Sequence, residues 1–207
     1  MSNLNYVSTV YTNLIEPIAV LYEEMVRRGA TNPTEVQATP TENGYAISII
    51  ALNAFLMEGV CGRTRYLAQL QGQHSVSDTF RSFGRADLAD KLDEVFVVRD
   101  VIAHSHLWTG NTDGIKWITN PVLLPGYGDG KFKRLVDLNT RTTHQLKLDV
   151  FPPRIHRVTA TIVIQECASA LQYLQSKDRN YVYLDPIHVP AQGKLKRFYR
   201  WADELPR

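Results

Sequence analysis

The residues best suited to chemistry lie together in one short stretch, residues 95–108. Arg99, Asp100, His104 and His106 interrupt a mostly apolar sequence there, and an apolar helix buries such groups only when they are paired or used. Arginine supplies a permanent cation whose forked donors match a phosphate, and histidine can move a proton near neutral pH. Arg99 and His104 together therefore indicate cleavage of a phosphodiester.

Four long segments with helical spacing of apolar residues must position this stretch. Thr39 precedes Pro40 and lies three residues before Glu42, which predicts a capped helix start. Pro17 falls inside the first segment, so that helix either kinks there or starts near residue 16. The predicted long helices span residues 7–28, 40–71, 85–108 and 153–177, and a short one spans residues 76–83.

The third predicted helix has two apolar stripes on nearly opposite sides. One stripe contains Val95 and Phe96, and the other contains Val97, Val101 and His104. One stripe should face the core. The other should face either a partner chain or a covering loop.

Residues 109–152 break the helical pattern with several glycines and prolines. Short β-like runs, such as residues 132–138 and 143–150, predict two or three strands. We therefore predict a mainly α fold in which residues 1–178 form one up-down four-helix bundle, with a small β insertion between the third and fourth helices. Residues 179–207 would form a tail that ends in basic and aromatic residues.

The composition is that of a globular chain with nearly balanced charge. Its 207 residues include 23 Lys and Arg against 21 Asp and Glu, so net charge alone does not indicate nucleic acid binding. Cys61 and Cys167 lie in apolar helical patterns without CxxC spacing, which favours buried free thiols in a reducing compartment. No signal peptide is visible, and the apolar run at residues 45–57 is short for a membrane span. We expect a cytoplasmic protein without membrane association.

The segment Arg99-Asp100-Val101-Ile102-Ala103-His104, at the end of the third of four helices, resembles the motif of the HEPN superfamily (higher eukaryotes and prokaryotes nucleotide-binding). The family motif is an arginine, usually followed by a polar residue, with a histidine four to six residues further on. The resemblance covers residues 7–108 and 153–177. Many members are metal-independent ribonucleases, often toxins or antiviral effectors, that act as dimers with motifs from both protomers lining one cleft.

The resemblance implies catalytic roles for Arg99, His104 and Asp100. His104 would act as general base or acid on the RNA 2′-hydroxyl or the leaving 5′-oxygen, and Arg99 would stabilise charge on the scissile phosphate. Alternatively, Arg99 belongs to a structural ion pair, His104 is a cation favoured by the helix C-terminus, and Asp100 faces solvent. Glu58 in the second helix could pair with Arg99 and hold it, or form an ordinary buried salt bridge.

Helix geometry limits what one chain can do. Arg99 and His104 are five residues apart, so on an ideal helix they point about 140° apart. Fraying of the helix end or a second chain must bring them together, and the stripe with His104 would then be the dimer face. His106 fits a satisfied core histidine better than a supporting site residue. It also occupies the position of a modified tyrosine in one subgroup of HEPN toxins that pair with a nucleotidyltransferase antitoxin, so we do not expect that neutralisation.

Basic residues in the insertion and the tail could bind an RNA backbone while neighbouring aromatic rings stack on bases. Solvated loop charge is the alternative. The candidates are Lys131, Lys133, Arg134, Arg197 and Arg200.

We expect no metal site and no cofactor, because His104 and His106 would point apart on a helix and no phosphate-binding loop is present. The leading hypothesis is a homodimeric, metal-independent endoribonuclease, a toxin or antiviral-defence effector with an antitoxin or effector partner. One alternative is a catalytically silent HEPN-like module that binds a nucleotide or a protein. Another is an unrelated helical interaction protein.

Overall fold

The computed structural model describes residues 11–29, 36–72, 75–104, 106–114, 116–119 and 121–206. The described chain is mainly helical, with three small antiparallel sheets of two strands each. The α-helices are α1 (Ile15–Arg27), α2 (Pro40–Leu67), α3 (Val76–Ser82), α4 (Ala86–Ala103), α5 (Gly130–Leu135), α6 (Arg157–Lys177) and α7 (Phe198–Asp203). The paired strands are β1 (Trp108–Thr109) with β2 (Val122–Leu123), β3 (Val136–Asp137) with β4 (Thr142–Thr143), and β5 (His188–Ala191) with β6 (Lys194–Arg197).

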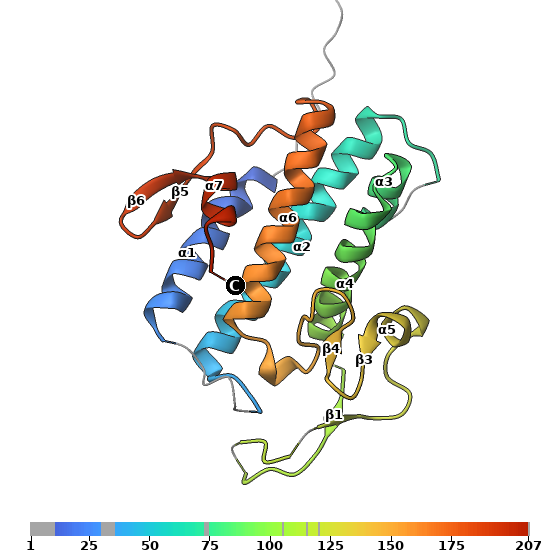
Figure 1. The fold of residues 1–207 in the computed structure, drawn as a ribbon, viewed down its shortest axis with the longest axis vertical. Helices are drawn as coiled ribbons and strands as arrows, with labels where there is room; N and C mark the ends of the chain where they lie inside the picture. Colours follow the sequence, from blue (N-terminus) through green and yellow to red (C-terminus); the bar gives the residue numbers. More distant parts are fainter. Residues whose placement is uncertain are drawn as a thin grey trace, which may run out of the picture.

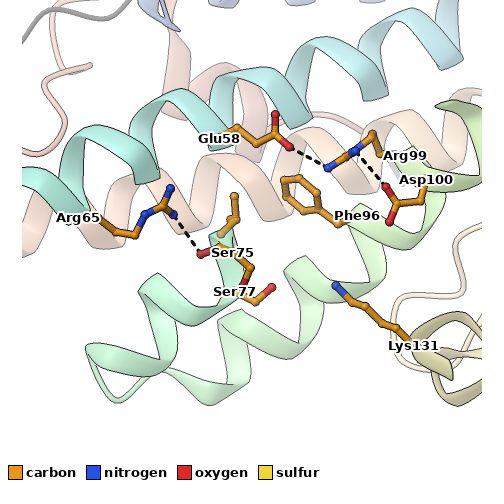
Figure 2. A pocket seen from close by; sticks show the side chains of 9 residues that line it. Glu58, Arg65, Ser75, Ser77, Phe96, Arg99, Asp100 and Lys131 are labelled. Carbon is orange, nitrogen blue, oxygen red and sulfur yellow. Dashed lines mark hydrogen bonds and ion pairs between the residues drawn. The ribbon is translucent and has the colours of Figure 1, made fainter. Parts of the chain in front are cut away.

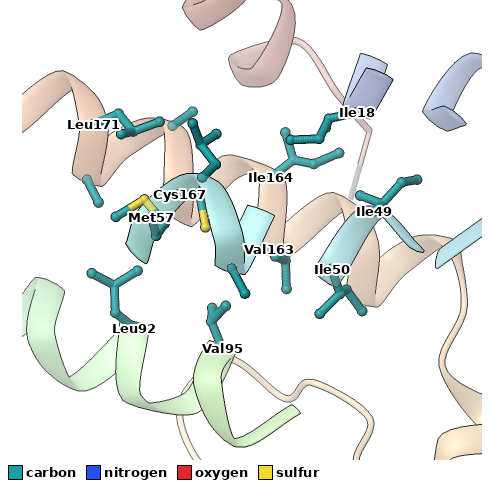
Figure 3. Packing of buried hydrophobic residues seen from close by; sticks show 14 of the residues in the cluster. Ile18, Ile49, Ile50, Met57, Leu92, Val95, Val163, Ile164, Cys167 and Leu171 are labelled. Carbon is teal, nitrogen blue, oxygen red and sulfur yellow. The ribbon is translucent and has the colours of Figure 1, made fainter. Parts of the chain in front are cut away.

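The four long helices α1, α2, α4 and α6 lie side by side, and successive ones run in opposite directions (Figure 1). Helix α2 packs against each of the other three. Apolar side chains from all four meet between them (Figure 3), including Ile18 of α1, Met57 of α2, Leu92 of α4 and Ile164 of α6. This confirms the predicted mainly α fold with a small β insertion.

Helix α2 begins where the sequence predicts. The Thr39 side chain accepts a hydrogen bond from the Glu42 backbone N–H, and Pro40 occupies the first helical position. Among the described residues, α2 is also the one helix that is long and apolar enough to cross a membrane by those two criteria alone. Half of its most apolar window is buried inside the protein, as in a central core helix.

Helix α1 begins at Ile15 and holds Pro17 in its first turn, where a missing N–H costs little. The predicted start at residue 7 lies outside the described residues. Cys61 of α2 and Cys167 of α6 are free and fully buried, as predicted. Burial raises the pKa of the Cys61 thiol to about 12.

Helix α4 is shorter than predicted. It ends at Ala103, and His104 is the residue that follows it. Trp108, expected at the helix end, instead begins β1 and pairs with Leu123. Its ring packs edge-on against Phe151, with ring centroids 5.5 Å apart. The prediction was wrong because the apolar spacing continues to Trp108, whereas packing with distant residues diverts the chain.

The insertion covers the second apolar stripe of α4. Helix α5 packs on α4, and Val97 and Val101 are buried within the chain itself. The sequence left open whether a partner chain or a covering loop faces this stripe. In the structure, a segment of the same chain covers it. Residues 132–135, expected in a strand, are helical because Asp129 caps α5 by accepting the Phe132 N–H at 2.7 Å. The run 143–150 contributes only its first residue to a strand, in β4.

The segment from residue 179 onward is not a separate tail. Strand β5 packs on α1, and α7 packs on α6. Phe198 and Trp201 are buried in the common core, and the Trp201 ring meets Tyr22 edge-on at 5.8 Å. Both rings therefore fill the core and are not exposed to stack on RNA bases.

Candidate functional site

Two adjoining cavities lie at the end of α4 that carries the motif. The larger, of about 400 Å³, is shown in Figure 2 and lies between α2, α3, α4 and α5. The smaller, of about 230 Å³, lies between the end of α4 and α5. Asp100 and Lys131 line both cavities, so the two cavities adjoin and share part of their walls.

Arg99 lines the larger cavity and is held by carboxylates on both sides. Its Nη2 lies 2.8 Å from Glu58 Oε1 and its Nη1 lies 3.0 Å from Asp100 Oδ1. Its guanidinium also lies over the Phe96 ring, 5.0 Å from the centroid. The ion pair between Glu58 and Arg99, one of the two alternatives from the sequence, is thus present, and it joins α2 to α4.

His104 lines the smaller cavity. Its backbone N–H donates to the Asp100 carbonyl at 2.9 Å, which closes the last turn of α4, and its side chain is exposed. Arg99 and His104 therefore do not face one cavity, as the helix geometry predicted. Asp100 stands between them and borders both spaces.

Lys131 is the one candidate from the insertion that reaches this site. Its Nζ lies 2.7 Å from Asp93 Oδ1 on α4. Asp93 is almost fully buried and also binds Arg81 at 2.5 Å and Ser77 at 2.7 Å. Burial alone would raise the pKa of Asp93, but the hydrogen bonds from Lys131, Arg81 and Ser77 outweigh it and hold the pKa below its usual value. The ionised Asp93 therefore fixes Lys131 at the boundary between the cavities.

His106 lies beyond the helix, in the smaller cavity, rather than on its core stripe. Its ring meets Phe132 edge-on at 5.0 Å and lies 6.3 Å from Tyr127. Burial, with a smaller contribution from His104, lowers the pKa of His106. Within the described residues its Nδ1 has no hydrogen-bond partner. The His106 ring is therefore packed as that of a core histidine would be, but the hydrogen-bonding capacity of its Nδ1 is not satisfied within the described residues.

The other basic candidates lie away from the two cavities. Lys133 and Arg134 are exposed on α5 and line neither space. Arg197 and Arg200 border a separate open depression that also contains carboxylates, and Arg200 donates to Glu204 at 2.8 Å. In Figure 1 their segment lies across the molecule from α5. The structure thus separates the basic residues into two regions.

Sequence reasoning missed Arg65, Ser75, Ser77 and Asp93. Arg65 lines the larger cavity, and its Nη1 donates to the Ser75 carbonyl at 3.1 Å and to Thr79 Oγ1 at 3.2 Å. One signal was available, because Arg65 lies seven residues after Glu58 and so shares its helix face. Asp93 interrupts an apolar helix, as Arg99 does, and could have been found by the same argument.

Among the described residues, no group of three or more His, Cys, Asp or Glu side chains is placed to hold a metal ion. Comparison with family models, with curated proteins and with solved structures finds no significant match to this chain.

Proposed function

We propose that this chain is an endoribonuclease of the HEPN type that cleaves RNA through its 2′-hydroxyl and needs no metal ion. The observation that carries the proposal is the arrangement of Arg99, Lys131 and His104 around Asp100 in two adjoining cavities. Two cations there can bind one phosphate, and an exposed imidazole lies in the neighbouring space. The resemblance of residues 99–104 to the HEPN motif supports the same reaction.

The groups fit the chemical steps of such a cleavage. Arg99 and Lys131 would bind the scissile phosphate and stabilise the negative charge that develops on it. His104 would accept the proton of the 2′-hydroxyl, whose oxygen then bonds to phosphorus, or protonate the 5′-oxygen as the P–O5′ bond breaks. The products are a 2′,3′-cyclic phosphate and a 5′-hydroxyl. Asp100 and Glu58 would position Arg99.

A homodimer would supply the second acid or base. One protomer offers His104 for one of the two proton transfers, and a second copy of His104 could perform the other. The stripe of Val97 and Val101, expected to form the dimer face, is covered by the chain's own insertion, so a dimer would have to form around the exposed His104 instead. Sedimentation of the purified chain would test this part of the proposal.

A second candidate function is a catalytically silent module that binds nucleotides. The observation in its favour is that both terminal nitrogens of Arg99 already bind carboxylates. A phosphate would have to compete with Glu58 and Asp100 for this guanidinium. A chain that binds nucleotides but leaves RNA intact would match this function.

The deciding experiment is cleavage of a labelled mixed RNA pool in EDTA. We expect the wild-type chain to cleave and to leave cyclic phosphate ends. His104→Ala should lose about 10²–10⁴-fold in rate, as removal of a general acid or base does. Arg99→Ala should lose about 10²–10³-fold, by analogy with removal of one oxyanion donor.

The matched controls are His188→Ala and Arg179→Ala, which replace exposed side chains outside both cavities. Both should retain wild-type cleavage, and circular dichroism should show that all four variants are folded. Cleavage that survives both site substitutions would contradict the proposal. A folded wild-type chain that binds nucleotides but cleaves no RNA would favour the silent module.

A further inference from the structure

The larger cavity extends beyond Arg99 to a second arginine. Arg65 and Glu58 lie on the same face of α2, about 10.5 Å apart along the helix axis, and Glu58 binds Arg99. Figure 2 shows Arg65 and Arg99 at opposite ends of the cavity, with Phe96 between them. The cavity therefore has a cation at each end.

The charges in this cavity are unevenly distributed. Its described lining contains two carboxylates, Glu58 and Asp100, and both bind Arg99. The end at Arg65 is lined instead by Ser75, Val76 and Ser77. An anion at that end would meet a guanidinium without an adjacent carboxylate in the described lining.

Arg65 is also held in place before any ligand binds. Both of its hydrogen bonds to the α3 region, to the Ser75 carbonyl and to Thr79 Oγ1, use Nη1. A guanidinium carries five N–H donors on three nitrogens. Fixing one nitrogen orients the group, so less side-chain entropy is lost when it binds an anion.

We propose that this cavity binds one nucleotide carrying a phosphate at both its 5′ and 3′ ends. Arg99 and Lys131 hold one phosphate, Arg65 holds the other, and the nucleoside lies between them. A volume of about 400 Å³ is within the range of small-ligand sites. The inference rests on the proposed function in one respect, namely that the phosphate at Arg99 is the one that is cleaved. The new element is that the enzyme also recognises the neighbouring phosphate of the RNA strand.

Calorimetric titration of the wild-type chain in EDTA tests the site without any cleavage. The probes are adenosine 3′,5′-bisphosphate, the 5′- and 3′-monophosphates, adenosine and inorganic phosphate. We expect the bisphosphate to bind about tenfold or more tightly than either monophosphate, as one additional charge-assisted contact would give. Equal affinities for the bisphosphate and the better monophosphate would overturn the inference.

Variants of Arg65 test whether this residue binds the second phosphate. Arg65→Gln should lower bisphosphate affinity to the level of a monophosphate, Arg65→Lys should retain part of the difference, and the exposed control Arg179→Gln should retain all of it. A bisphosphate preference that survives in folded Arg65→Gln would overturn the assignment. If Arg65→Gln does not fold, the comparison of ligands on the wild-type chain still decides.

The two proposals can fail separately. A bisphosphate preference in a chain that cleaves no RNA would support this site and contradict the nuclease. RNA cleavage by a chain that binds bisphosphate and monophosphate equally would support the nuclease and overturn this site.

Discussion

Arg99 is oriented by two ion pairs that would leave it able to bind the proposed phosphate. Its partners Glu58 and Asp100 are 45% and 40% exposed, and ion pairs in such positions contribute only about 0–1 kcal/mol. A phosphate that accepts two parallel hydrogen bonds from the guanidinium is a stronger partner. The two carboxylates can therefore hold Arg99 in place without preventing an anion from displacing them.

The lowered pKa of His106 predicts that the protein loses stability in mild acid. Burial lowers its pKa in the folded chain below the ordinary value of 6.5, so the unfolded chain binds a proton at a higher pH than the folded chain does. The free energy of unfolding must then rise with pH in that interval and fall as the pH drops below about 6.5. Urea unfolding at about pH 5.5 and about pH 7.5 would measure the difference.

Substitution of His106 would test whether this residue causes the pH dependence. His106→Gln should reduce the difference in unfolding free energy between the two pH values, because the variant has no group at this position that titrates there. His188→Gln is the matched control, since His188 is exposed on β5. An unchanged difference in His106→Gln would show that other groups cause the pH dependence.

At the scale of elements, two consecutive acidic residues of α4 hold the insertion. Asp93 binds Lys131 of α5. Glu94 accepts the backbone N–H groups of Gln145 and Leu146, one on each carboxylate oxygen and both at 2.7 Å. Asp93 and Glu94 are 5% and 2% exposed, so the insertion is attached to the helix through nearly buried charges. This attachment places Lys131 at the site.

Glu94→Ala should destabilise the chain by about 2–4 kcal/mol, because two backbone donors lose a charged partner. Urea unfolding would measure the loss, and hydrogen exchange should accelerate at the amides of Gln145 and Leu146. The control is Asp90→Ala on the same helix, whose carboxylate is 60% exposed and should contribute no more than about 1 kcal/mol. Equal effects of the two substitutions would mean that Glu94 does not hold the insertion.

At the scale of the whole molecule, one core joins both ends of the described chain. Tyr22 near the start and Trp201 near the end meet edge-on, and both belong to the same buried cluster as the central residues of α2. The C-terminal hairpin and α7 therefore pack into the same core as the long helices. Their basic residues lie on its outer surface.

Trp201→Ala should cost about 3–5 kcal/mol of unfolding free energy, the usual effect of removing a large buried aromatic side chain. Leu195→Ala, in β6 of the same segment, is the matched control because Leu195 is 72% exposed. Denaturant unfolding followed by circular dichroism would compare them. A small effect of Trp201→Ala would mean that the C-terminal segment folds independently of the core.

Features that depend on neighbouring residues can be predicted from the sequence. The start of α2 follows from Thr39 and Pro40, and the burial of Cys61 and Cys167 follows from helical periodicity, since both signals act within one or two turns. The pairing of Glu58 with Arg99 was one of two alternatives, because charged residues in apolar helices must find partners.

Features that depend on residues far apart in the chain follow from the packing of the whole molecule. The packing of Trp108 on Phe151 diverts the chain after Ala103, and the binding of Lys131 to Asp93 draws the insertion over α4. Trp201 is buried because α1 and α6 leave room for it, whereas its basic neighbours in sequence suggested an exposed surface. Local pattern specifies each helix and its apolar face, but the packing of all the elements decides what covers that face, and with it the shape of the site.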